Sequence, residues 1–257
     1  MRLSFVLATL LLVLAAAPPA AADSMTVEGE RRTWTLRLPE GVERPPLILV
    51  LHGGGGRGRQ IERHSGMTEA ALPAGFAVAY PDGLHRQWND GRGDLVSAEK
   101  GNLRDDVAFL TALVDRLAAE GRIDPARVYV MGISNGGMMT YRLLCEAAGR
   151  FAGAVAIVAN LGEEIAPACQ PSRPVPLMVL NGTDDPLVPY EGGTVGRDRG
   201  RVLSTEATLA RFAAVNGCAG REQVAVADPA PQDGVTPERI VYSGCTAPTE
   251  LWRFVGG

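Results

Sequence analysis

The sequence predicts an α/β fold in which a mainly parallel sheet is covered by helices on both faces. Short apolar runs of the strand type alternate along the chain with helical segments. Several runs are apolar at every position, as strands are when both faces of a parallel sheet are buried. The 257 residues, 46% of them hydrophobic, suffice for one large core and contain no internal repeat.

Each expected element has its own local signal. The expected strands, in chain order, are Thr33–Leu38, Pro46–Leu51, Phe76–Tyr80, Arg127–Met131, Ala152–Val158, Pro176–Leu180 and Glu250–Val255. The expected helices start near Asp105, at Met138 and at Ser204. In the first helix two aspartates open the first turn, and leucines at 110, 113 and 117 recur at helical spacing before Gly121 ends it.

The N-terminus reads as a secretory signal peptide over residues 1–22. Arg2 precedes an apolar run from Leu3 to Ala17, which is followed by two prolines and by small residues suited to cleavage before Asp23. A membrane helix is the alternative, but the run is shorter than the ~20 residues that span a bilayer. Residues 23–257 are therefore expected to form one exported domain, secreted or periplasmic, with no stable membrane insertion.

The net charge and the cysteine content limit which binding partners and which kinds of cysteine site are expected. A formal net charge of −4 gives no basic surface for nucleic acid. In an oxidising compartment Cys145, Cys169, Cys218 and Cys245 are expected in disulfides rather than in a metal site, because none has CxxC spacing. Their spacing allows three pairings.

The strongest chemical signal is the segment Gly132-Ile133-Ser134-Asn135-Gly136, where a buried strand passes directly into a helix. In that context GxSxG marks a nucleophile, because the sharp turn lifts the serine to a helix N-terminus and leaves no room for side chains two residues away. The alternative is an ordinary glycine-rich loop. The segment predicts Ser134 as a catalytic nucleophile.

Two further segments supply the partners of a serine nucleophile. The glycines after His52 would turn bare N–H groups toward a substrate, so Gly54, with Gly53 second, is expected to form an oxyanion hole with the N–H of Asn135. The GxxxxGK[ST] pattern of a phosphate loop is absent. His52 itself is expected to shape the turn.

The acid of a triad is expected at the end of a later strand, where Pro176–Leu180 runs into Asn181-Gly182-Thr183-Asp184-Asp185-Pro186. Spacing alone does not separate Asp184 from Asp185. Either could also be a turn residue before proline.

Together these blocks resemble the polyhydroxybutyrate depolymerase and feruloyl esterase family of secreted α/β-hydrolases. The resemblance runs from about Glu30 to the C-terminus through LHGGGG, YPDG with Trp88-Asn89-Asp90, DDVAFL, DPARVYVMGISNGGMMTYRLLCE and NGTDDPLVPYEGG. It implies that Asp185 is the acid, and with sequence nearness it favours the pairs Cys145–Cys169 and Cys218–Cys245. Asn181 departs from the family's usual histidine. No metal or organic cofactor is implied.

A triad also needs a histidine, and the three in this sequence, His52, His64 and His85, all precede Ser134. Members of the resembling family carry the base just after the last strand, where this sequence reaches Gly257. We expect a fragment that lacks the end carrying the base; a pseudoenzyme is the alternative. His85 and Trp88 are expected to line the rim of the substrate pocket.

The expected function is that of a secreted serine esterase acting through a Ser-Asp-His triad on small-molecule or polymeric esters. Polyhydroxyalkanoate oligomers and feruloyl or acetyl esters are the substrate classes that the resemblance implies. The alternative is a non-catalytic, exported binding protein on a hydrolase scaffold.

Overall fold

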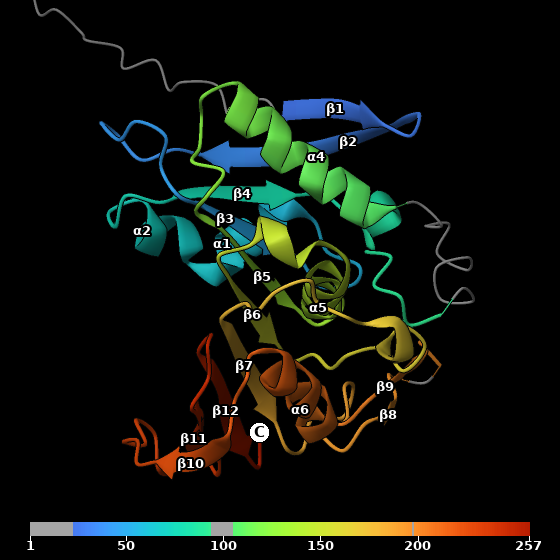
Figure 1. Ribbon diagram of the computed structural model, residues 1–257, viewed down its shortest axis with the longest axis vertical. Coiled ribbons are helices and arrows are strands. Elements are labelled where there is room, and N and C mark those ends of the chain that lie inside the picture. Colours follow the sequence, from blue (N-terminus) through green and yellow to red (C-terminus); the bar gives the residue numbers. More distant parts are fainter. Residues whose placement is uncertain (1–22, 94–104, 197) are drawn as a thin grey trace, which may run out of the picture.

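The computed structural model describes residues 23–93, 105–196 and 198–257, and its centre is a ten-stranded sheet (Figure 1). The strand order is β1-β2-β4-β3-β5-β6-β7-β12-β11-β10. The strands from β4 to β12 run parallel, and an antiparallel pair extends the sheet at each side. The mainly parallel sheet is thus confirmed. The predicted signal peptide, residues 1–22, lies outside the described residues.

The strands have the following bounds: β1 Asp23–Val27, β2 Glu30–Arg37, β3 Leu47–Leu51, β4 Ala77–Pro81, β5 Val128–Ile133, β6 Gly153–Ile157, β7 Leu177–Gly182, β8 Gly193–Thr194, β9 Arg201–Val202, β10 Gly220–Val224, β11 Thr236–Ser243 and β12 Thr249–Val255. The helices are α1 Gly58–Ser65, α2 Met67–Ala71, α4 Asp106–Ala119, α5 Asn135–Ala147 and α6 Thr205–Val215, with short 3-10 turns η1 Leu84–Arg86, η2 Ala148–Arg150 and η3 Ala166–Ala168. Every expected strand and helix is present, with ends shifted by a few residues.

Strands β1, β10 and β11 at the ends of the sheet were not expected from the sequence. β10 (GREQV) is exposed at four of its five positions, and its single apolar residue, Val224, makes no alternating pattern. β11 pairs with β12 through backbone hydrogen bonds and buries little beyond Ile240. Exposed strands that are held mainly by backbone hydrogen bonds show no alternation of apolar and polar residues by which the sequence could predict them.

Helices cover both faces of the sheet, as predicted. The side chains of Leu49, Val130 and Val179 point to the face that α4, α5 and α6 cover, in the larger core cluster. On the other face α1 and α2 cover Val50 and Tyr80. Figure 1 shows α5 and α6 along the middle of the sheet and α1 and α2 near β3 and β4 only.

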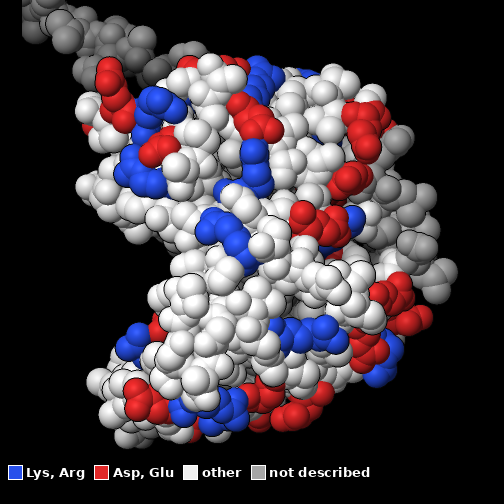
Figure 2. Space-filling view, in the orientation of Figure 1, with Lys and Arg blue, Asp and Glu red and all other residues white. Residues whose placement is uncertain are grey.

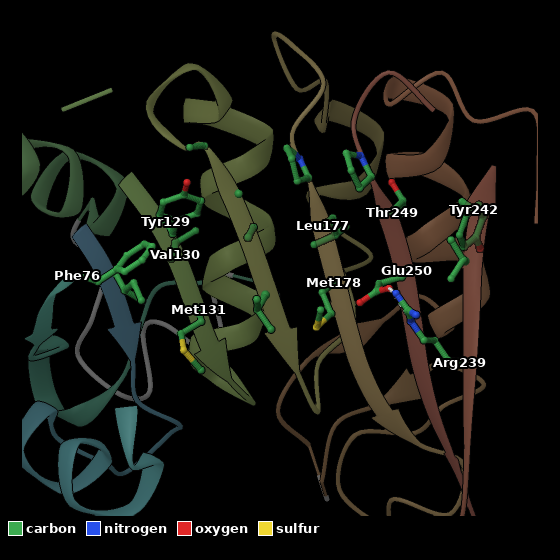
Figure 3. Close-up of a pocket in the computed structure, with 18 of the residues that line it drawn as sticks. Phe76, Tyr129, Val130, Met131, Leu177, Met178, Arg239, Tyr242, Thr249 and Glu250 are labelled. Carbon is green, nitrogen blue, oxygen red and sulfur yellow. Dashed lines mark hydrogen bonds and ion pairs between the residues drawn. The ribbon is translucent and has the colours of Figure 1, made fainter. Parts of the chain in front are cut away.

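An apolar groove of about 740 Å³ therefore lies on the α1–α2 face, over β5, β6, β7 and β12. Figure 2 shows this side of the molecule hollowed between α1 and α2 and the β10–β11 end of the sheet. Tyr129 and Met131 of β5 and Met178 of β7 project into the groove, and the ion pair between Arg239 and Glu250 lies at one end (Figure 3).

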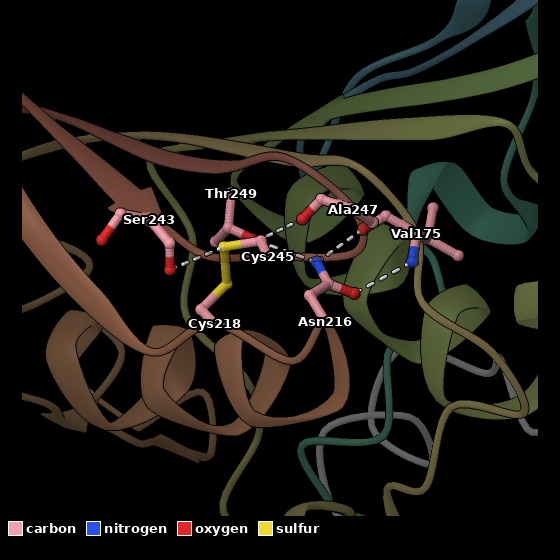
Figure 4. The surroundings of a disulfide bond; sticks show 7 residues. All are labelled: Val175, Asn216, Cys218, Ser243, Cys245, Ala247 and Thr249. Carbon is pink, nitrogen blue, oxygen red and sulfur yellow. Dashed lines mark hydrogen bonds between the residues drawn. A yellow bond between two sulfur atoms is a disulfide. The ribbon is translucent and has the colours of Figure 1, made fainter.

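Two disulfides have the expected pairing, Cys145–Cys169 and Cys218–Cys245. The second joins the segment after α6 to the turn before β12 (Figure 4). Beside it the Asn216 amide bonds the backbone of Val175 through both of its polar atoms. Among the described residues, no helix is both long and apolar enough to cross a membrane.

Candidate active site

Ser134 occupies a strained turn between β5, which ends at Ile133, and α5, which begins at Asn135. Its backbone has φ 54° and ψ −121°, in the left-handed range that a residue with a Cβ rarely adopts. Its N–H donates to the Ile157 carbonyl at 2.8 Å, which ties the turn to β6. Ser134 is half-buried at the carboxyl edge of the sheet, where groups at strand ends meet.

The glycines of the motif are required by backbone contacts. A Cβ on Gly132 would lie 2.2 Å from the Gly136 carbonyl oxygen, and a Cβ on Gly136 would lie 2.4 Å from the Leu51 carbonyl oxygen. Both distances are far below a van der Waals contact. The prediction that side chains two residues from Ser134 would collide is therefore confirmed.

The loop after β3 lies against this turn. A Cβ on Gly53 would be 3.6 Å from the Ser134 Cβ, so no side chain separates this loop from the nucleophile. The Gly54 N–H donates to no acceptor among the described residues, and the first N–H groups of α5, including that of Asn135, have no acceptor within their helix. The loop is docked by the Gly55 N–H, which donates to the Arg86 carbonyl at 2.8 Å.

His52 is a structural residue of that loop. It is 1% exposed, and Nε2 accepts a hydrogen bond from the Gly83 N–H at 3.0 Å. The proton is therefore on Nδ1, which donates to the Gly53 carbonyl at 2.8 Å. Burial lowers the pKa of His52 from its ordinary value. With both ring nitrogens occupied, the imidazole has no free lone pair for a base.

Trp88 was expected at a pocket rim, and its placement contradicts that role. It is 3% exposed, its indole N–H donates to the His52 carbonyl at 2.9 Å, and its ring centroid is 4.9 Å from that of His52. Its backbone N–H donates to Oδ1 of Asn135, and its carbonyl accepts from Nδ2 of the same side chain. Trp88 therefore joins the glycine loop after β3 to the turn of Ser134 from the core side.

The candidate acid lies at the same edge of the sheet, in the loop after β7. Oδ1 of Asp185 accepts from the N–H groups of Leu187 and Val188 at 2.7 and 2.8 Å. Its Oδ2 has no hydrogen-bond partner among the described residues and is open to a further donor. Asp184 is exposed and accepts only from the neighbouring Thr183 hydroxyl. This geometry favours Asp185 over Asp184 as the residue that orients a base.

Asn181, at the end of β7, supports the acid loop. It is 4% exposed, and its amide bonds both the N–H and the carbonyl of Ala159 and donates to Thr205. Nearby, burial followed by the Glu206 charge raises the pKa of Tyr190 to about 12, so this phenol stays protonated and donates to Glu206.

The other two histidines lie near the glycine loop after β3, His85 in the 3-10 turn η1 and His64 on α1. His85 is exposed, and its backbone has a left-handed conformation with φ 49°. Its side chain lines a cavity of about 290 Å³ with Arg57 and Arg86. His64 is exposed on α1 and lines a smaller cavity of about 200 Å³ with the glycine loop. Within the described ranges, no group of three or more His, Cys, Asp or Glu side chains could hold a metal ion.

Two residues behind the turn of Ser134 have a role that the sequence did not indicate, although Asp90 belongs to one of the segments that carry the resemblance. Asp90 and Arg92 form an ion pair at 2.9 Å, with side chains 3% and 4% exposed. An ion pair between residues two positions apart in a loop leaves no periodic pattern in the sequence. Only the fold shows that Asp90 reaches Asn135, 45 residues away.

Comparisons with known proteins agree with this geometry. Residues 72–162 match the model of the prolyl oligopeptidase family. The chain is 34% identical over 85% of its length to NocK of Nocardia uniformis subsp. tsuyamanensis, a protein named as an esterase, and spans 66% of it. It is 30% identical over 74% of its length to feruloyl esterase B of Piromyces equi and spans 36% of that protein. With feruloyl esterase C of Emericella nidulans it shares 28% identity, covering 88% of this chain and 76% of that one.

Solved structures show the same fold. An acetyl xylan esterase from Aspergillus awamori superposes with a TM-score of 0.62, covering 91% of this chain and 93% of that chain, at 15% identity. A thermostable esterase gives a TM-score of 0.55 over 76% of this chain and 52% of that one, at 20% identity. With the strand order, the serine turn and these sequence relatives, the chain belongs to the feruloyl esterase-like family of α/β-hydrolases.

Proposed function

We propose that this chain is the catalytic domain of a serine carboxylic ester hydrolase. The observation that carries the proposal is the left-handed Ser134 between β5 and α5, with the bare glycine loop of Gly53 and Gly54 against it. A strained backbone at a half-buried serine has a cost that folding must offset elsewhere, and such strain concentrates at functional sites. The relatives named as esterases support the same chemistry.

In the proposed reaction a base takes the Ser134 hydroxyl proton as Oγ attacks the ester carbonyl carbon. The carbonyl oxygen becomes an oxyanion, which the N–H groups of Gly54 and Asn135 stabilise. The carbon–oxygen bond to the alcohol then breaks, and the base returns its proton to the leaving alkoxide. Water repeats the sequence on the acyl-serine and releases the acid, while Asp185 holds the base in one orientation.

We propose that the base is a histidine whose ring N–H donates to the open Oδ2 of Asp185. The loop of the candidate acid lies against the last residues of the described chain, since the Asp184 N–H donates to the Gly257 carbonyl at 2.8 Å. The Gly256 N–H donates to the Thr183 hydroxyl in the same contact. The loop of the candidate acid is thus bound to the backbone after β12, while Oδ2 of Asp185 accepts from no described residue.

The proposed substrates are esters of small acyl or aryl acids. Feruloyl and acetyl esters are supported by the names of the relatives, and polyhydroxyalkanoate oligomers are the further class that the family resemblance implies. Export is supported by the apolar segment before Asp23 and by two disulfides, which persist in oxidising compartments. Mass analysis of the exported protein should find Asp23 as its first residue.

The test uses the polypeptide expressed from the complete open reading frame. We expect it to hydrolyse p-nitrophenyl acetate and methyl ferulate, and Ser134→Ala to abolish both activities. A fluorophosphonate probe should label the wild type on Ser134 and leave the variant unlabelled, because labelling requires an activated serine. Equal turnover by both proteins would contradict the assignment. A folded wild type that neither hydrolyses nor labels would favour the non-catalytic binding protein.

A further inference from the structure

Asp90 and Arg92 form a buried ion pair directly behind the nucleophile turn. The Arg92 Nε lies 3.0 and 2.9 Å from the two Asp90 carboxylate oxygens, and Nη2 lies 2.9 Å from Oδ2. Nη1 of Arg92 donates to the Arg199 carbonyl at 2.9 Å. An ion pair taken out of water is weak evidence for stability, since desolvation offsets its attraction. Stability alone therefore does not explain why both charges are buried beside the candidate active site.

The Asp90 carboxylate holds the side chain of the proposed oxyanion donor. Nδ2 of Asn135 donates to Oδ2 of Asp90 at 2.6 Å and to the Trp88 carbonyl at 2.9 Å, while Oδ1 accepts from the Trp88 N–H at 2.8 Å. Every hydrogen-bonding group of this 3% exposed amide is thus occupied. The side chain cannot turn without breaking a bond, and its own backbone N–H is fixed with it.

We propose that Asp90 is a positioning residue that fixes the oxyanion donor Asn135, and that Arg92 keeps this support electrically neutral. The proposal rests on the proposed function. Its physical basis is that an oxyanion hole works by holding its donors in place before charge develops. A carboxylate accepts more strongly than an amide, but an unpaired negative charge behind the hole would oppose the oxyanion in a site of low dielectric. The positive charge of the Arg92 guanidinium neutralises the Asp90 carboxylate and so reduces this repulsion.

A purely structural role predicts a different result. If the pair only joined the loop of residues 88–92 to the body of the protein, its loss would lower the melting temperature without a selective effect on kcat. A positioning role lowers kcat while KM is kept, because the Asn135 N–H bonds the oxyanion rather than the ground state.

The experiment compares three variants of the polypeptide from the complete reading frame: Asp90→Asn, Arg92→Met and the double variant. Asp90→Asn turns an amide NH₂ toward the Arg92 donors and disturbs the bond to Asn135. Arg92→Met keeps the acceptor but leaves its charge unpaired. We expect each single change to lower kcat about tenfold or more, with KM within about twofold of wild type. The double variant is neutral and keeps an acceptor for Asn135, so it should recover most of the loss.

Arg142→Met is the matched control. Arg142 donates to the Asn89 carbonyl at 2.7 Å in the same loop, but within the described part of the chain it has no hydrogen bond or ion pair with Asp90 or Asn135. It should keep the wild-type kcat. Melting temperatures and near-ultraviolet circular dichroism are measured for all variants. If one single variant does not fold, the other still tests the prediction, because the double variant should have a higher kcat than that folded single variant.

Activity of the wild type that Ser134→Ala abolishes is measured first. An inactive wild type overturns the proposed function and this inference with it. An active wild type overturns the inference alone in two cases: if kcat is unchanged in both single variants, or if the losses of the two single variants multiply in the double variant. Losses that simply follow the fall in melting temperature, in Arg142→Met as well, would also overturn it.

Discussion

At the residue scale, Ser134 owes its position to the absence of side chains around it. Gly132 and Gly136 let three backbone segments approach one another more closely than any Cβ would allow, and Gly53 opens the remaining side. The left-handed backbone of Ser134 is kept because bonds on both sides of it are satisfied, at Ile157 and within α5. The reactive geometry is therefore a property of backbone packing.

This reasoning predicts opposite results for two glycine-to-alanine changes. In Gly136→Ala the new methyl would lie 2.4 Å from the Leu51 carbonyl oxygen, so we expect a loss of about 1–3 kcal/mol and of esterase activity. In Gly149→Ala nothing lies within 4 Å of the added Cβ, and wild-type properties are expected. Urea unfolding of both variants measures the difference. Equal stability of the two would contradict the packing account.

His52 predicts a pH dependence of stability. Desolvation by burial lowers its folded pKa below the value near 6.5 of the unfolded chain, so the unfolded chain binds more protons between the two values. Stability should fall as the pH is lowered through about 6.5 toward the folded pKa. Melting temperatures from pH 7.5 to 5 should fall less steeply in His52→Gln, with the exposed His64→Gln as the comparison. Parallel curves for wild type and His52→Gln would rule out the contribution.

At the scale of elements, the segment from Gly83 to Arg92 holds the two halves of the candidate oxyanion hole together. Its left-handed turn at His85 and Arg86 presents the carbonyl that bonds Gly55, and its Trp88 and Asp90 bond Asn135. None of these contacts follows from the local sequence. The motif WND was recognised by resemblance, but its buried role depends on the approach of β3, η1 and α5.

The two disulfides should contribute similarly to stability, because they close loops of similar length. Cys145–Cys169 spans 24 residues and Cys218–Cys245 spans 27. Each disulfide lowers the conformational entropy of the unfolded chain, which stabilises the folded protein by about 3 kcal/mol. Replacing each pair by serines should shift the urea midpoint by a comparable amount. An unchanged midpoint for either pair would contradict the prediction.

The second disulfide offers a further distinction. It lies beside Asn216 and Val175, next to the amino end of β7, whereas Ser134 and Asp185 lie at the carboxyl edge (Figure 4). Loss of this pair should therefore lower stability without changing kcat at temperatures where the variant is folded.

At the scale of the whole molecule, the apolar groove over β5, β6 and β7 is unusual, since parallel sheets are normally buried on both faces. An exposed apolar surface of this kind binds hydrophobic dyes and promotes association. We expect the 257-residue polypeptide to enhance the fluorescence of anilinonaphthalene sulfonate and Met178→Lys to reduce that signal. Leu187→Lys, at an exposed leucine outside the groove, is the control. An equal reduction in both variants would show that the dye binds elsewhere.

The sequence by itself determined the parallel strands, the helices that follow them and the serine turn, because apolar periodicity and glycine spacing are local properties. Nearness in the sequence and the family resemblance favoured the two disulfide pairs among three possible pairings, and the structure shows them. Only the tertiary structure decided that Trp88 is a core residue, that His52 uses both ring nitrogens and that Asp90 reaches Asn135. Those facts depend on which loops meet at the carboxyl edge of the sheet, and contacts between residues 30 to 50 positions apart leave no pattern in the chain.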